Sequence, residues 1–190
     1  MRLRNYRGIQ KLTIDNWLKG IACSVILFSL SCVPNKSYQT PGASELQGIW
    51  VENPGPEKSN PDNIYYSKFQ LRFSCDSVYI TTEVHSKYNY GDSHCFNEGH
   101  WYEYQKAGYT LAHDSLILDG VFTKPNFRMK ISGCYHSGNF HEVFKIKKLI
   151  PNDIKNANGK DSLLIYPPHE EGLVHLYRTD KWVCKPHVLE

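Results

Sequence analysis

Short runs in which apolar and polar residues alternate follow one another along most of this chain. An early run is LQGIWVE at residues 46–52, and a proline-rich loop follows it. Apolar residues then alternate with polar ones at 69–73 and again at 78–80, on either side of the turn-forming residues SCDS. Because alternation with a period of two places every second side chain on one face of a strand, these two runs predict a β-hairpin.

The rest of the chain continues this pattern and contains little that favours a helix. The best helix candidate, around residues 153–158, is short and lies between Pro151 and Gly159. We therefore expect an all-β protein of roughly eight to ten antiparallel strands joined by turns. The further strand-like runs are 101–111, 116–121, 126–135, 139–150, 161–166 and 173–178.

A sheet with this many short strands has to close into a barrel or stack as a sandwich, because open edges with exposed backbone groups promote aggregation. The chain from residue 46 to 190 has the length of one domain with a single core. Residues 32–45 are polar, contain two prolines and a glycine, and show no periodicity. They predict a flexible tether that precedes the folded domain.

One uninterrupted apolar run, residues 21–31, precedes this tether and ends at Cys32. As a helix it would be roughly 17 Å long, too short for a hydrocarbon layer of roughly 30 Å. Basic residues dominate the segment before it, so residues 1–31 predict a secretory signal peptide that is removed on export. Small residues before Cys32 resemble the lipobox of bacterial lipoproteins, which implies lipidation at Cys32. The alternatives are an ordinary signal peptide cleaved nearby, or a core strand behind a basic tail.

The charge balance changes once this leader is set aside. The chain has 22 Lys and Arg and 19 Asp and Glu, of which 5 and 1 fall within residues 1–31, so 17 and 18 remain. The remaining chain is close to neutral, and the net charge of +3 for the whole sequence does not indicate a nucleic-acid partner.

Four of the six cysteines lie after Cys32, at positions 75, 95, 134 and 184. An even number in an exported chain predicts two disulfides, whereas their wide spacing is not that of a zinc site. Antiparallel strands place successive loops at opposite ends of a barrel, which disfavours the pairs Cys75–Cys95 and Cys134–Cys184. Two pairings remain: Cys95–Cys134 with Cys75–Cys184, or Cys75–Cys134 with Cys95–Cys184. The choice depends on whether 101–111 is one strand or two.

Several motifs resemble those of one family. LQGIW is similar to the G-x-W opening of lipocalin-like domains, and FSCDSVYI, CFNEGHWYEY, HDSLILDGVFTK and ISGCY together resemble small lipocalin-like lipoproteins of Gram-negative bacteria over roughly residues 46–186. The resemblance implies a single antiparallel up-and-down β-barrel, held by two disulfides and anchored to a membrane by its N-terminal lipid. Such sequences sometimes carry the name fumarate hydratase. A hydratase of that name needs either three thiolates on an iron–sulfur cluster or a long helical bundle. Here the cysteines are expected to form disulfides and the sequence predicts no long helix, so a hydratase activity is disfavoured.

Aromatic side chains are the strongest candidates for a binding site, since rings at a barrel mouth can stack on a sugar or line a cavity for an apolar ligand. Tyrosine also favours strands for packing reasons alone. The candidate ligand-binding residues are Trp50, Phe69, Phe73, Tyr88, Tyr90, Trp101 and Tyr109.

Histidines are a weaker candidate. If Cys95 pairs with Cys134, then His94, His100 and His136 would approach one another, but no recognised metal-binding spacing supports a site there. We expect neither a metal nor another cofactor.

Enzymatic motifs are absent from the sequence, including a G-x-S-x-G elbow, a P-loop and a dinucleotide fingerprint. We therefore expect an exported, lipid-anchored protein, periplasmic or on the cell surface, that binds a small apolar or aromatic ligand and is not an enzyme. The alternative is an interaction module with a filled core that contacts envelope proteins or glycans through its loops. The volume of the barrel interior distinguishes these two hypotheses.

Overall fold

The structure is a computed structural model. The predicted signal peptide, Cys32, Tyr90 and the candidate helix at 153–158 lie outside the described residues. The described residues are 39–53, 55, 60, 62–89, 91–150, 160–168 and 172–187. Within these ranges, no helix has the length and apolar character needed to cross a membrane.

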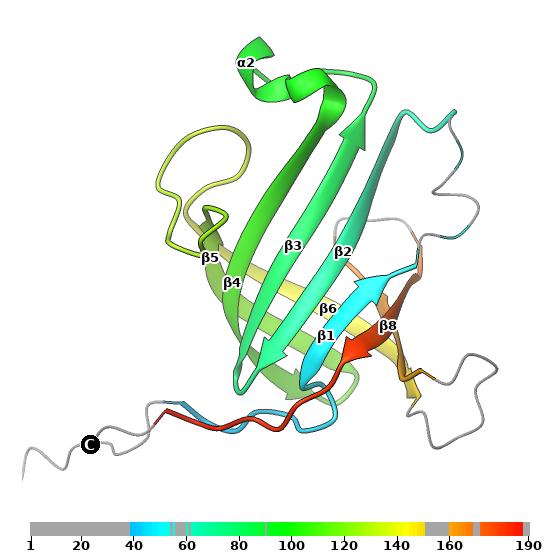
Figure 1. The fold of residues 1–190 in the computed structure, drawn as a ribbon, viewed down its shortest axis with the longest axis vertical. Coiled ribbons are helices and arrows are strands. Elements are labelled where there is room, and N and C mark those ends of the chain that lie inside the picture. The colour runs from blue at the N-terminus through cyan, green and yellow to red at the C-terminus, as the bar shows by residue number, and fades with distance from the viewer. Residues whose placement is uncertain are drawn as a thin grey trace, which may run out of the picture. The chain divides into compact units, whose positions relative to one another are not determined.

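Eight antiparallel strands close into one barrel, with each strand paired to its neighbours in the sequence and β8 paired to β1 (Figure 1). This confirms the predicted all-β, up-and-down barrel. The helical elements described are one short turn, α2 (Ser93–Phe96), and the 3-10 turn η1 (Asn97–Gly99). The strands are β1 (Gly48–Glu52), β2 (Tyr65–Ser74), β3 (Ser77–Ser86), β4 (His100–Ala112), β5 (Ser115–Thr123), β6 (Asn139–Ile150), β7 (Ser162–Tyr166) and β8 (Val174–Asp180).

The alternation seen in the sequence sets which side chains enter the barrel. In β2, Leu71 and Phe73 are buried, and in β3, Val78 and Ile80 are buried, while the residues between them are more exposed. The apolar core fills the half of the barrel that contains the start of β1, the β2–β3 and β4–β5 turns and the end of β8. We call this half the base, and the opposite half, with the β3–β4, β5–β6 and β7–β8 connections, the mouth.

The glycine and the tryptophan of the G-x-W motif both have structural roles at the base of the barrel. Gly48 has a φ of 131°, and a Cβ there would lie 2.0 Å from the carbonyl oxygen of Asp180, so the close approach of β1 to β8 requires glycine. Trp50 is fully buried and its indole nitrogen donates to the Leu46 carbonyl at 2.7 Å. The guanidinium of Arg178 lies 4.4 Å from the centre of the Trp50 ring. The motif therefore fixes the seam at which the barrel closes.

The segment before β1 packs beneath the base. The Gln47 side chain is buried, donates to the Cys75 carbonyl at 2.9 Å and accepts from the Cys75 amide at 2.7 Å. The Ala43 amide donates to the Tyr109 hydroxyl, and the Thr40 amide donates to Asp76. The described end of the predicted tether thus lies against the barrel.

Both disulfides follow one of the two predicted pairings. Cys75 bonds to Cys184 at the base, with Cα atoms 5.0 Å apart, and Cys95 bonds to Cys134 at the mouth, with Cα atoms 5.4 Å apart. This pairing follows from β4, which is one continuous strand of 13 residues. One strand, and not two, carries the chain from the end of the barrel near Cys95 to the end near Cys75, so the loop that holds Cys134 lies at the same end as Cys95. Two disulfides indicate a protein from an oxidising compartment.

The strand predicted at 126–135 is wrong. Most of this segment is a loop, and Met129 alone makes an isolated bridge, to Thr123. Phe127 and Tyr135 have positive φ values of 58° and 61°, a left-handed conformation that interrupts an extended strand. The apolar residues that suggested a strand, such as Ile131, are exposed instead.

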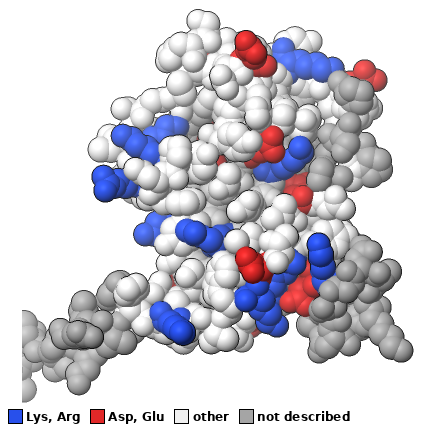
Figure 2. All heavy atoms as spheres, viewed as in Figure 1, with Lys and Arg blue, Asp and Glu red and all other residues white. Residues whose placement is uncertain are grey.

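The closed part of the sheet is confined largely to the base. The β1–β2 ladder runs from Gly48↔Phe73 to Val51↔Gln70, whereas the β2–β3 ladder continues to Tyr65↔Ser86. Strands β2, β3 and β4 therefore rise well above β1 and β8 (Figure 1). Acidic and basic side chains are interspersed on the face that Figure 2 shows, in keeping with the near-neutral composition.

Candidate functional site

A cavity of about 390 Å³ occupies the mouth half of the barrel. Inward-facing positions on β2 through β6 form most of its wall. The exposed His141 of β6, and Pro167 and Pro168 just after β7, also line it. The cavity exists because the mouth half extends beyond the packed core while its inward positions carry polar residues such as Ser67, Thr82 and Gln105. These side chains fill less of the interior than the leucines and isoleucines of the base.

Phenylalanine rings supply the apolar part of the wall. Phe69 and Phe144 lie toward the packed core, and Phe144 is buried. Phe122 and Phe140 have ring centres 5.3 Å apart, and the Phe122 ring also stacks on the imidazole of His136 at 5.0 Å. These flat surfaces suit contact with an aromatic or apolar group.

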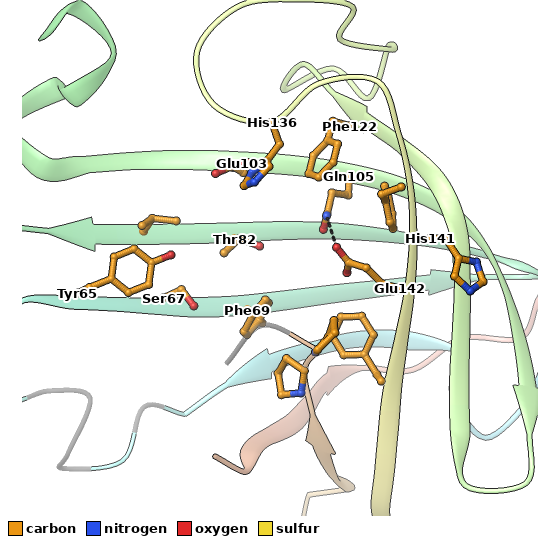
Figure 3. Close-up of a pocket in the computed structure, with 15 residues that line it drawn as sticks. Tyr65, Ser67, Phe69, Thr82, Glu103, Gln105, Phe122, His136, His141 and Glu142 are labelled. Atoms are coloured by element: carbon orange, nitrogen blue, oxygen red, sulfur yellow. Dashed lines mark hydrogen bonds and ion pairs between the residues drawn. The ribbon is translucent and has the colours of Figure 1, made fainter. Parts of the chain in front are cut away.

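The polar part of the wall is built around two carboxylates. The Glu103 carboxylate lies 2.7 Å from Nδ1 of His136, and the Gln105 amide donates to Glu142 at 3.5 Å. Figure 3 shows His136, Glu103 and Phe122 close together below the β5–β6 loop, with Glu142 across from Gln105. Among the described residues that line the cavity, none is lysine or arginine.

The Cys95–Cys134 disulfide fastens the β5–β6 loop to the β3–β4 connection above this cavity. The ring of Tyr135 stacks on Trp101 with centres 4.3 Å apart and planes 3° from parallel, and its hydroxyl donates to the Cys95 carbonyl. Burial, followed by the negative charge of Glu103, raises the pKa of Tyr135, so its hydroxyl keeps its proton and remains a donor. These contacts hold the loop residue His136 at the cavity.

The candidate ligand-binding residues separate into several environments. Phe69 lines the cavity, whereas Trp50, Phe73 and Tyr109 belong to the packed core of the base. The hydroxyl of Tyr109 donates to the Cys75 carbonyl at 2.8 Å, and burial raises the pKa of Tyr109. These three rings therefore stabilise the base.

The other three candidates lie near the mouth. Trp101 is half-buried under Tyr135, and Tyr88 is 57% exposed in the β3–β4 connection. Tyr90 lies outside the described residues.

The three histidines considered as a cluster do not meet at one site. His136 pairs with Glu103 at the cavity, while His100 lies on the outer face of the barrel beside Glu83. His94 lies next to Cys95, whose sulfur is in a disulfide and is not a thiolate ligand.

Most of the polar cavity residues were not among the candidates predicted from the sequence, including Ser67, Thr82, Gln105 and Glu142. The alternation of side chains along each strand could have revealed them. Each of these residues is an even number of positions from a core residue of its own strand and therefore faces the same side. Thr82 is two positions from Ile80, and Gln105 is two positions from Ala107.

Fold and site together define an eight-stranded antiparallel β-barrel with a packed base and a cavity in its mouth half. No protein-family model, curated protein or solved structure matches this chain.

Proposed function

We propose that this protein is an exported, lipid-anchored, lipocalin-like barrel that binds a small ligand in the mouth cavity, and that it acts by binding and not by catalysis. The observation that carries this proposal is the cavity of about 390 Å³ inside the barrel. Cavities of roughly 300 to 1,000 Å³ lined by aromatic rings and a few polar groups are the usual sites for small molecules. A completely filled barrel would have favoured the interaction module.

The lining specifies the ligand's chemistry. An aromatic or apolar body fits between Phe69, Phe122 and Phe140. The carboxylates of Glu103 and Glu142 accept hydrogen bonds and favour a ligand that carries a donor, such as an amine or a hydroxyl group.

Binding can be tested with N-phenyl-1-naphthylamine, a neutral aromatic amine whose fluorescence rises in apolar surroundings. Thr82→Trp places a large ring inside the cavity, whereas Thr81→Trp places the same ring on the outer face of β3. We expect the wild-type protein and Thr81→Trp to bind the probe equally well. Thr82→Trp should weaken binding by at least about tenfold, which is about 1.4 kcal/mol of binding free energy.

Near-UV circular dichroism of both variants reports whether the barrel remains folded. A folded Thr82→Trp protein that binds the probe as well as the wild type contradicts the cavity as the binding site. The absence of any fluorescence change with the wild-type protein contradicts the proposed ligand class.

Export and lipidation rest on the sequence pattern that ends at Cys32. The two disulfides, which are typical of an oxidising compartment, support export. Mass spectrometry of the protein from its native cells tests both. We expect an acylated N-terminus at Cys32 and a mass lower by four hydrogens than that of the reduced chain. A product that begins at Met1 and carries free thiols contradicts the proposed location without affecting the cavity.

A further inference from the structure

A compact group of potential metal ligands lies on the outer face of the barrel, on the side of the sheet opposite to the cavity. Glu83 and His85 are two residues apart in β3, so their side chains share one face. His100 begins β4 and is directly opposite His85 in the β3–β4 ladder. Three donor side chains from two paired strands therefore meet at one place, which we call the β3–β4 histidine cluster.

The donor atoms of this cluster are close together. Oε1 of Glu83 lies 2.9 Å from Nε2 of His85 and 2.9 Å from Nε2 of His100. All three ligand atoms lie within 4.8 Å of one another. A zinc ion 2.0 to 2.1 Å from each ligand at tetrahedral angles separates its ligands by roughly 3.3 Å. The observed spacing differs from this by only a few tenths of an ångström for both carboxylate–imidazole pairs.

Stacking fixes the two imidazole rings in this arrangement. The His85 ring lies between Tyr66, with ring centres 4.5 Å apart, and His100, with ring centres 4.4 Å apart, and the planes are nearly parallel in both contacts. The ring of Tyr102 also contacts His100, edge to face, with ring centres 5.2 Å apart. Because each Nε2 lone pair lies in the plane of its ring, one of the two nearly parallel imidazole rings has to rotate before both can ligate one ion. The donor atoms are already close together, so the rotation is local to the side chain.

We propose that the β3–β4 histidine cluster binds a divalent first-row transition-metal ion through Nε2 of His85, Nε2 of His100 and a carboxylate oxygen of Glu83. Two imidazoles with one carboxylate form a ligand set that zinc, copper and nickel accept. A groove of about 270 Å³ runs past both histidines and also contacts Glu98 and Asn63. This groove leaves room for water to complete the coordination.

The charges around the cluster suit this role. The Glu83 carboxylate faces both imidazole nitrogens and offers a cation an acidic oxygen ligand. Lys68 Nζ lies 3.9 Å from Oε2 of Glu83, so its ammonium group competes with a metal ion for the same carboxylate.

Isothermal titration of the metal-free, full-length protein with zinc chloride tests the proposal. We expect one zinc ion to bind per chain. His100→Ala and Glu83→Gln should each weaken binding by at least about tenfold, since loss of a ligand costs no less than loss of a group that orients one. Lys68→Met should strengthen binding, because it removes the competing ammonium group.

His141→Ala is the matched control. His141 is also an exposed histidine that faces a carboxylate across two paired strands, with Nδ1 2.6 Å from Asp119, but it has no second imidazole partner among the described contacts. We expect this variant to bind zinc like the wild type. Substitution of cobalt(II) for zinc supplies a second readout, since its visible absorption reports imidazole ligation independently of heat.

Two results would overturn the proposal: zinc binding that is unchanged in folded His100→Ala and Glu83→Gln proteins, or a wild-type protein that takes up no zinc at millimolar concentration. The cluster is on the outer face, so neither result bears on the ligand cavity.

Discussion

Removal of the two disulfides should cost this protein most of its stability. Cys75–Cys184 closes a loop with a sequence separation of 109, and Cys95–Cys134 closes one of 39 that lies within it. A crosslink stabilises a fold chiefly because it restricts the unfolded chain, and the effect grows slowly with loop length.

The nested arrangement determines the magnitude. In the chain-entropy model the 39-residue loop contributes about 4 kcal/mol at 25 °C. Once that loop is closed, the 109-residue separation is reduced to an effective length of about 70, and Cys75–Cys184 then contributes about 4 to 4.5 kcal/mol more. The total of about 8 kcal/mol is comparable with the whole unfolding free energy of an ordinary domain, which is about 5 to 15 kcal/mol.

Urea unfolding followed by tryptophan fluorescence measures these losses, because Trp50 is fully buried in the base. The proteins to compare are the wild type, Cys95→Ala/Cys134→Ala, Cys75→Ala/Cys184→Ala and the variant with all four substitutions. Reduced wild-type protein separates the loss of the crosslinks from the void that alanine leaves at the buried Cys75 site. The reasoning is refuted if the fourfold variant and the reduced protein both unfold within about 1 kcal/mol of the oxidised wild type.

Three further predictions concern single side chains. Gly120→Ala should lower the free energy of unfolding by about 1 to 3 kcal/mol, because its Cβ would lie 2.3 Å from a β4 carbonyl oxygen. In the same urea assay Gly91→Ala should be neutral, because a Cβ at Gly91 has no atom within 4 Å. Arg178→Met should cost about 3 to 5 kcal/mol by urea unfolding, because it removes the guanidinium that lies 2.9 Å from the nearly buried carboxylate of Asp161. Burial lowers the pKa of His175 below its ordinary 6.5, so the folded protein takes up that proton less readily than the unfolded chain. The contribution of neutral His175 to the free energy of unfolding is fully present above pH 6.5 and is lost as the pH falls through the lower pKa of the folded state. Between pH 7.5 and pH 5, the urea midpoint of the wild type should therefore fall more than that of His175→Gln.

The base of the barrel could be predicted well from the sequence because local rules determine it. Alternation placed Phe73 and Val78 on one face, and the SCDS turn between them is the observed β2–β3 connection. The glycine and tryptophan of G-x-W mark the closing seam, where Gly48 meets β8 and Trp50 fills the core. The number of strands between the cysteines reduced the three possible disulfide connectivities to two. The observed length of β4 then selected one of them.

The cavity could not be located in this way. Alternation shows which face of a strand points inward, but it does not show how far each ladder continues, and the space exists because β2–β3 pairing extends beyond β1–β2 pairing. The bulky rings were therefore expected at the site, whereas Trp50 and Tyr109 pack the base. The pair formed by Glu103 and His136 joins β4 to a loop after β5, a contact that depends on the disulfide and not on sequence spacing.

The two ends of the barrel are held together by different forces, and this explains how one small domain can be both stable and hollow. At the base, apolar side chains fill the interior, and the buried pair of Arg178 and Asp161 lies beside Trp50. At the mouth, polar side chains leave about 390 Å³ unfilled, so that half gains less from apolar burial. Long backbone ladders and the Cys95–Cys134 crosslink compensate there, since both restrain the chain without occupying the interior. The disulfide therefore stabilises the mouth half of the barrel although apolar side chains do not fill its interior.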